Sequence, residues 1–147
     1  MPGKIKYEKH THGNTPAQSL VEVALLLPLL LVLALGAIDF GRLFMIKFIL
    51  TNAAKEGATY ISYYANKVTD PWTALYTVVK DEALSSGVSV SDDEITFTGC
   101  CAQDVPVTVT VTKEVDLIFD GFLQAVGVIS GPMTVSGSVQ MMVLVRP

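Results

Sequence analysis

The sequence predicts an α+β protein in which one long N-terminal helix supports a short helix and a small three-stranded antiparallel sheet. Three observations predict this fold. The run Leu20–Ile38 is apolar or glycine at all but one of its nineteen positions. Helical spacing of apolar residues continues well beyond it, and after Gly87 the pattern changes to strict alternation. We therefore expect a leader over residues 1–17, a long helix over 18–67 and an exported α+β domain over 68–147.

Residues 1–17 are predicted to be a leader that stays in the cytoplasm. They carry three lysines against one glutamate, and their prolines and glycines oppose regular structure. Beyond Thr51 the acidic side chains outnumber the basic ones by eleven to five. The positive-inside bias then keeps the N-terminus in the cytoplasm and places the C-terminal domain outside. A domain without a basic patch is not expected to bind nucleic acid.

The apolar run is predicted to form the transmembrane half of the helix, at about residues 20–38. At about 1.5 Å per residue, nineteen residues extend roughly 28 Å, close to the ~30 Å hydrocarbon core of a bilayer. Pro28 lies inside it and predicts a kink. Glu22 lies near its start, where a charge costs about 2.5–3.5 kcal/mol on insertion scales, so it indicates a functional position with a partner. The alternative is that Glu22 only caps the positive end of the helix dipole.

Beyond the span, the helix carries two features that each allow two interpretations. Asp39 and Arg42 are three residues apart, so they form either an intrahelical pair at the outer interface or a contact between subunits. The small side chains of Ala53, Ala54 and Ala58 permit close approach of the sheet. Alternatively, these alanines face other subunits and the second helix alone covers the sheet.

The exported domain is predicted to begin with a helix and to continue as strands. Asp70 is expected to cap this helix, Pro71 to occupy its first position and Gly87 to end it. Alternating residues then predict strands at 88–90 and 95–98, at 105–112 and at 134–145, with an apolar connection before the last. So small a sheet needs a helix against it, and the upper half of the long helix is the expected support.

The composition does not indicate an enzyme, a metal site or a cofactor. Both histidines, His10 and His12, fall in the leader, so the exported part has no histidine to act as a general base. Cys100 and Cys101 are adjacent, which does not match zinc-ligand spacing. A vicinal disulfide, an intermolecular bridge, two reduced thiols and plain turn residues all remain open for them. The acidic cluster at 92–94 lacks the spaced oxygens of a calcium loop and is interpreted as a solvated turn.

Three segments closely resemble the TadE-like family, the minor pilins or pseudopilins of the tight-adherence (Flp-type) pilus. They are Gln18–Pro28 (QSLVEVALLLP), Gly36–Arg42 (GAIDFGR) and Asn52–Ala58 (NAAKEGA), and residues 107–111 and 131–138 extend the likeness. The resemblance implies a type IV pilin-like fold and a role in pilus assembly and surface adhesion. It implies as partners the membrane, other pilin subunits, the assembly platform and a prepilin peptidase. We expect an oligomer or a filament component.

The resemblance also implies cleavage between Ala17 and Gln18, which would make Glu22 the fifth residue of the mature chain. The chain departs from the family pattern at Ala17, where glycine is usual, and at Val23, where Tyr or Phe is common. Cleavage would create an α-amine at Gln18, and Glu22 of the same or a neighbouring subunit could pair with it. In low dielectric such a pair is strong enough to set the register of assembling helices.

Two other functions are compatible with the pattern. One is a signal-anchored surface protein that no prepilin peptidase processes and that displays a small binding domain. The other is a secreted protein whose apolar run is a signal peptide cut near Ala34-Leu35-Gly36. The second is disfavoured because the amphipathic helical pattern continues through Asp39 to Tyr64, which a cleaved signal does not require.

Overall fold

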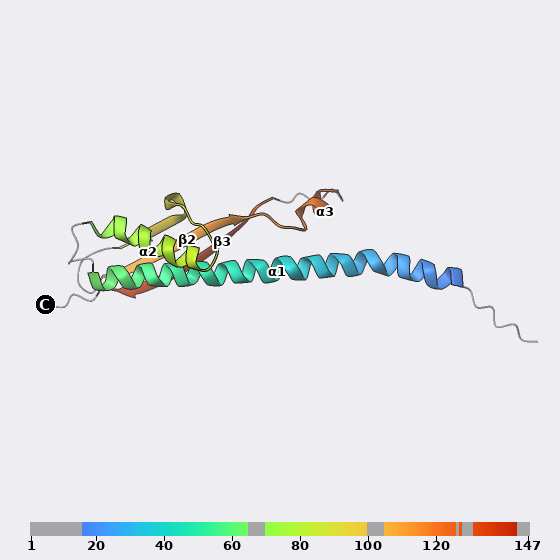
Figure 1. Ribbon diagram of the computed structural model, residues 1–147, viewed down its shortest axis with the longest axis horizontal. Helices are drawn as coiled ribbons and strands as arrows, with labels where there is room; N and C mark the ends of the chain where they lie inside the picture. The colour runs from blue at the N-terminus through green and yellow to red at the C-terminus, as the bar shows by residue number, and fades with distance from the viewer. Residues whose placement is uncertain (1–15, 65–69, 100–104, 126, 128–130, 144–147) are drawn as a thin grey trace, which may run out of the picture. The chain divides into compact units, whose positions relative to one another are not determined.

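A computed structural model describes residues 16–64, 70–99, 105–125, 127 and 131–143 (Figure 1). The elements follow in the order α1, α2, a 3₁₀ turn at Asp92–Glu94, β1, β2, α3 and β3. The α+β class is confirmed, with a long apolar N-terminal helix, a second short helix and a three-stranded antiparallel sheet. The chain forms two compact units, residues 1–34 and 35–147, and residues contact one another mainly within each unit.

The described part of the first unit is the beginning of helix α1, which as a whole extends over Pro16–Tyr64. It begins two residues before the predicted Gln18 because proline at the first helical position has a suitable φ and gives up an N–H that has no partner there. The leucines from Leu20 to Leu33, with Val21 and Val23, are more than half exposed. Among the described residues α1 is the one helix long and apolar enough to cross a membrane, and none of its apolar window is buried.

Helix α2, Pro71–Ser85, has the predicted start and end. The Asp70 carboxylate accepts hydrogen bonds from the backbone N–H groups of Trp72 at 3.1 Å and Thr73 at 3.3 Å. These contacts satisfy donors that the first turn of a helix leaves without partners. Gly87 follows the helix with a φ of 84°, a left-handed conformation that glycine adopts without strain.

The sheet consists of β1 (Ile95–Thr98), β2 (Pro106–Val115) and β3 (Met133–Met142), in the order β1-β2-β3. Both pairings are antiparallel, with Phe97 and Val139 opposite Val109 on the central strand. The strand predicted at 88–90 does not form. The N–H of Val88 instead donates to the Ala83 carbonyl at 3.0 Å and so completes the end of α2.

The apolar connection between β2 and β3 contains a short helix that the sequence pattern did not predict, α3 at Asp120–Ala125. The amide of Gln124 donates to the Asp120 carboxylate at 2.9 Å, one helical turn away. Pairs at this spacing stabilise a helix only weakly. A single turn and a half has too few periodic positions to be recognised from sequence alone.

The core lies between one face of the sheet and the two longer helices (Figure 1). Fully buried side chains come from β2, from the second half of α1 and from α2: Val107, Val109, Val111, Ala53, Ala54, Ala58, Leu75, Val79 and Ala83. The prediction that the α1 alanines support the sheet is confirmed. The alternative, in which they face away from the sheet, is wrong because all three are fully buried within this one chain.

Two glycines mark where backbones approach closely. A Cβ on Gly57 of α1 would lie 2.5 Å from Val79 Cγ2 and 2.8 Å from Leu75 Cδ1, both on α2. A Cβ on Gly137 of β3 would lie 2.5 Å from the Leu50 carbonyl carbon of α1. Helix α1 therefore contacts α2 at Gly57 and the edge strand β3 at Gly137.

Candidate functional site

The peptide bond between Ala17 and Gln18 lies in the first turn of α1, which begins at Pro16. The first four N–H groups of a helix have no intrahelical acceptors, so this turn is held less firmly than those that follow. A protease that takes its substrate in an extended conformation would have to unwind this turn.

Glu22 lies on α1 one turn beyond Gln18, and its residue is exposed in the isolated chain. It is the one charged residue that the sequence contains between positions 16 and 38. Its neighbours Val21 and Val23 are 59% and 60% exposed. The carboxylate therefore lies at the N-terminal edge of an apolar surface that a bilayer or another helix would cover.

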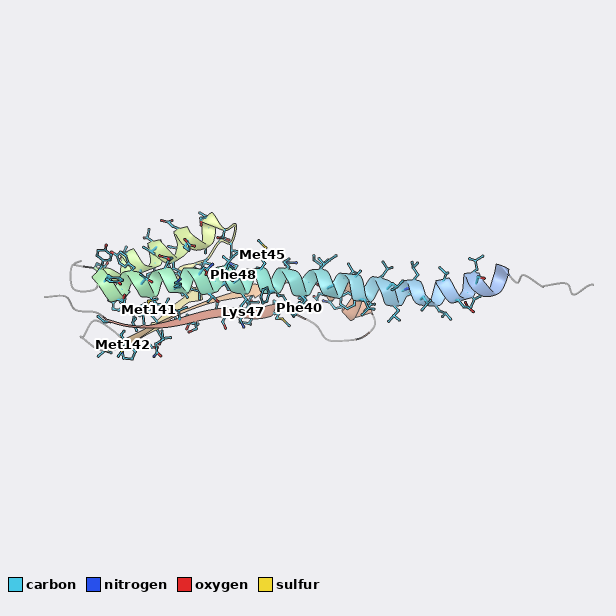
Figure 2. All side chains as sticks on the ribbon, turned by 90° about the horizontal axis from the view of Figure 1, so that it is seen from below. Phe40, Met45, Lys47, Phe48, Met141 and Met142 are labelled. Atoms are coloured by element: carbon cyan, nitrogen blue, oxygen red, sulfur yellow. The ribbon has the colours of Figure 1, made fainter. Side chains whose placement is uncertain are left out.

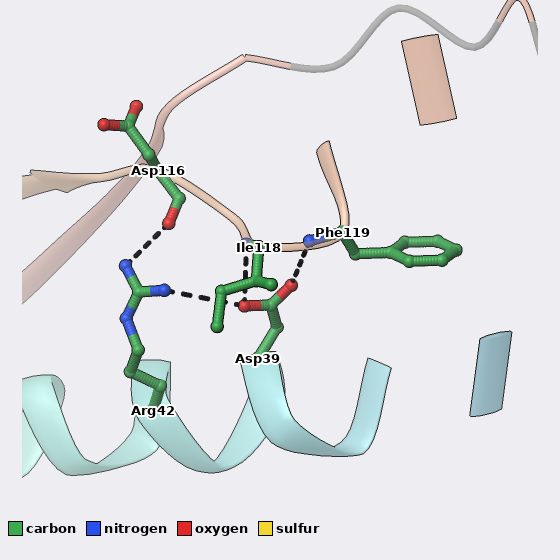
Figure 3. A network of polar contacts seen from close by, with 5 residues as sticks. All are labelled: Asp39, Arg42, Asp116, Ile118 and Phe119. Atoms are coloured by element: carbon green, nitrogen blue, oxygen red, sulfur yellow. Dashed lines mark hydrogen bonds and ion pairs between the residues drawn. The ribbon is translucent and has the colours of Figure 1, made fainter. Parts of the chain in front are cut away.

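Asp39 forms the main polar contact between α1 and the segment that follows β2 (Figure 3). Its side chain is nearly buried, with the whole residue 5% exposed. Its Oδ1 accepts a hydrogen bond from the N–H of Ile118 at 3.0 Å, and its Oδ2 accepts one from the N–H of Phe119 at 2.8 Å. One carboxylate therefore binds two successive backbone donors.

Arg42 completes this contact. Its Nη1 lies 3.7 Å from Asp39 Oδ1, and its Nη2 donates to the backbone carbonyl of Asp116 at 2.7 Å (Figure 3). We call these contacts among Asp39, Arg42, Asp116, Ile118 and Phe119 the α1 clamp. Asp39 and Arg42 thus pair within α1, and the Arg42 guanidinium also contacts the segment that follows β2.

The clamp forms where the chain leaves the sheet. Strand β2 ends at Val115, so the N–H groups of the next residues have no strand partner and need other acceptors. Hydrogen bonds from neutral N–H groups to a carboxylate are shorter and stronger than neutral pairs. The sequence singled out Asp39 and Arg42 but not Ile118 or Phe119, which contribute backbone groups about 80 residues away and leave no signal in residue type.

An apolar surface lies on α1 beside the clamp and beyond it. Phe40, Met45 and Phe48 are 72%, 62% and 62% exposed, and Figure 2 shows them along the helix. A groove of about 630 Å³ lies between this part of α1 and the start of β3. It is lined by Phe40, Leu43, Phe44, Lys47 and residues 133–136.

The acidic cluster at 92–94 has partners within the protein. Lys113 Nζ donates to Glu94 Oε1 at 3.0 Å, the Ser91 N–H donates to Glu94 Oε2 at 2.9 Å, and Lys80 pairs with Asp92 at 2.7 Å. Partial burial raises the pKa of Glu94, but the hydrogen bonds from Ser91 and Lys113 outweigh it and leave that pKa below its ordinary value. These contacts stabilise the turn that precedes β1.

Across the part of the chain that the structure describes, no three His, Cys, Asp or Glu side chains are grouped closely enough to hold a metal ion. Cys100 and Cys101 lie outside the described residues, so their state stays a prediction.

The comparison with protein families finds a match for the part of the chain that carries the α1 residues of this site. Residues 17–59 match the family described as TadE-like protein. The resemblance to that family is thus confirmed over the segment that carries Glu22, Asp39 and Arg42. No curated protein and no solved structure matches the chain. The similarity over residues 17–59 suggests a link to the Tad pilus, and the apolar helix α1 fits a single-pass membrane protein.

Proposed function

We propose that this protein is a minor pilin or pseudopilin that acts in assembly of a tight-adherence pilus. Residues 20–38 anchor it in the cytoplasmic membrane, with the N-terminus in the cytoplasm and the α+β domain outside. The observation that carries the proposal is the match of residues 17–59 to the TadE-like family. Its partners in this role are other pilin subunits, the assembly platform and a prepilin peptidase.

The exposed surface of α1 supports an assembly role. The leucines from Leu20 to Leu33, with Val21 and Val23, are more than half exposed in the isolated chain, so lipid or neighbouring helices must cover them. Farther along, Met45 and Phe48 remain exposed where the helix is no longer part of the predicted span. Exposed aromatic and methionine side chains are typical of protein contacts. We assign these two residues to contacts with other subunits.

Glu22 supplies the register of assembly in this proposal. Once the leader is removed after Ala17, the new α-amine of Gln18 is a cation one helical turn from Glu22. A carboxylate in an apolar environment is costly unless it is paired, so a helix sliding past its neighbour is most stable where amine and carboxylate meet.

The proposal is tested by comparing Glu22→Ala with Glu56→Ala, a matched change at an exposed glutamate of the same helix outside the predicted span. Glu22→Ala is expected to reach the membrane at least as well as the wild type, because a charge has left the apolar run. Piliation and surface adhesion are expected to fall in Glu22→Ala and to stay normal in Glu56→Ala. Normal piliation by Glu22→Ala would refute the assembly role and leave Glu22 as a residue of the helix end.

A further inference from the structure

We propose that the segment following β2 contacts the membrane directly, with Ile118 in the interfacial region of the bilayer on the side of the exported domain. In this arrangement the protein meets the lipid at two places, the span of α1 and the tip of the α+β domain. The inference rests on insertion of α1 into a membrane and not on assembly of a pilus, so each can fail without the other.

The first argument is depth. Asp39 directly follows Ile38, the last residue of the apolar run, so it lies at the end of the predicted span. The clamp holds the N–H groups of Ile118 and Phe119 at 3.0 and 2.8 Å from the Asp39 carboxylate. The interfacial region on each side of a bilayer is about 5–8 Å thick. A segment that bonds to Asp39 is therefore at the level of the lipid headgroups or just below them.

The second argument is the surface exposed at this level. Ile38 and Phe40 flank Asp39 on α1 and are 55% and 72% exposed, and Ile118 is 56% exposed. Figure 3 shows the Phe119 ring extending beyond Asp39 on the side opposite to Arg42. In water these large apolar side chains would be exposed unfavourably. At the boundary between lipid headgroups and acyl chains they would contact apolar lipid.

The third argument is that the segment has few polar groups that would keep it in water. In the sequence from 117 to 129 the one charged residue is Asp120, and it accepts a hydrogen bond from Gln124. The clamp provides acceptors for the N–H groups of Ile118 and Phe119 and a donor for the Asp116 carbonyl. Backbone groups that already have partners enter a low-dielectric region at a much lower cost. The clamp therefore both positions the segment and prepares it for lipid.

The test uses the full chain in phosphatidylcholine vesicles whose lipids are brominated either near the headgroup end or near the middle of the acyl chains. The wild type has one tryptophan, Trp72, which stacks on Phe97 in the exported domain. Two variants place the single tryptophan elsewhere: Trp72→Phe with Ile118→Trp, and Trp72→Phe with Leu30→Trp. Ile118 and Leu30 are both exposed, at 56% and 60%, so a larger side chain fits at either position.

We expect tryptophan at 118 to be quenched severalfold more than Trp72, and more by the shallow bromines than by the deep ones. Tryptophan at 30 should be quenched in either lipid, which verifies insertion of α1. Quenching at 118 no greater than at Trp72, with position 30 quenched, would overturn the proposal. The proposal would also be overturned if tryptophan at 118 showed blue-shifted emission only at high protein density, with no quenching by bromine. A second copy of the chain would then cover the segment. Absence of quenching at position 30 would also overturn it, since α1 would not be inserted.

Discussion

Gly57→Ala tests the contact between α1 and α2, because two effects of opposite sign compete at this position. Alanine is the better helix former by about 0.8–1.0 kcal/mol in a helix interior. The added Cβ, however, would lie 2.5 Å from Val79 Cγ2 and 2.8 Å from Leu75 Cδ1, well inside contact distance. Overpacking of this kind costs typically about 1–3 kcal/mol.

The clash is expected to win because its partners cannot easily move. Val79 is fully buried in the middle of α2, where a β-branched side chain has essentially one χ1 rotamer. Leu75 is fully buried as well. We therefore expect Gly57→Ala to lower the free energy of unfolding by up to about 2 kcal/mol, the net of the two effects.

Gly41→Ala is the matched control, since a Cβ at Gly41 of the same helix would meet nothing within 4 Å. This variant should be as stable as the wild type or up to about 1 kcal/mol more stable. Unfolding is followed in detergent micelles through the fluorescence of Trp72, whose ring lies 4.3 Å from that of Phe97. If α1 remains helical when the domain unfolds, the greater helix propensity of alanine does not change the free energy of unfolding of either variant. Only the clash at Gly57 then lowers that free energy. Equal stability of Gly57→Ala and Gly41→Ala would refute the packing of α2 against Gly57.

Three further predictions concern the core, the clamp and the acidic turn. Val109→Ala should lower the free energy of unfolding by about 2–3 kcal/mol in a denaturant titration, because Val109 is fully buried in the core that the sheet forms with both helices. Thr108→Ala, on the opposite face of β2, should lower it far less. Asp39→Ala should accelerate hydrogen exchange at the amides of Ile118 and Phe119 by about 10- to 100-fold. Glu56→Ala should leave the exchange rates of these amides unchanged. Equal rates in the wild type and in Asp39→Ala would contradict the clamp. Because the folded-state pKa of Glu94 is lowered, its contact with Lys113 should stabilise the fold above the ordinary glutamate pKa of about 4.3 and lose that effect as the pH falls through the lower folded value. Glu94→Gln should therefore reduce the loss of unfolding free energy on acidification by about 0.2–1 kcal/mol. Glu114→Gln, at an exposed position on β2, should leave that loss unchanged.

The sequence predicted the elements whose signals repeat or are strictly local. The apolar run of α1, the Asp70–Pro71 start of α2 and the valine alternation of β2 each combine a period with a cap or a turn residue. Short elements were predicted less well. The strand expected at 88–90 competes with the end of α2 for its backbone donors, and α3 is too short to show a period.

The candidate site could be predicted only in part, for a similar reason. Glu22, Asp39 and Arg42 are conspicuous because charged side chains interrupt an apolar helix. Their partners are not conspicuous. The clamp binds backbone N–H groups of an isoleucine and a phenylalanine, and a backbone donor is present at every residue but proline. Only the fold, which returns the chain to α1 after β2, identifies which donors Asp39 binds.

The N-terminus of the native protein tests the proposed pilin function most directly. The protein would be purified from cells with an active prepilin peptidase and analysed by intact-mass spectrometry and N-terminal sequencing. The account predicts a chain that begins at Gln18, which makes Glu22 the fifth residue, and a full-length chain both in cells that lack the peptidase and in the variant Ala17→Phe. A native protein that keeps Met1 in the presence of the peptidase would contradict the account, and the chain would then be a signal-anchored surface protein.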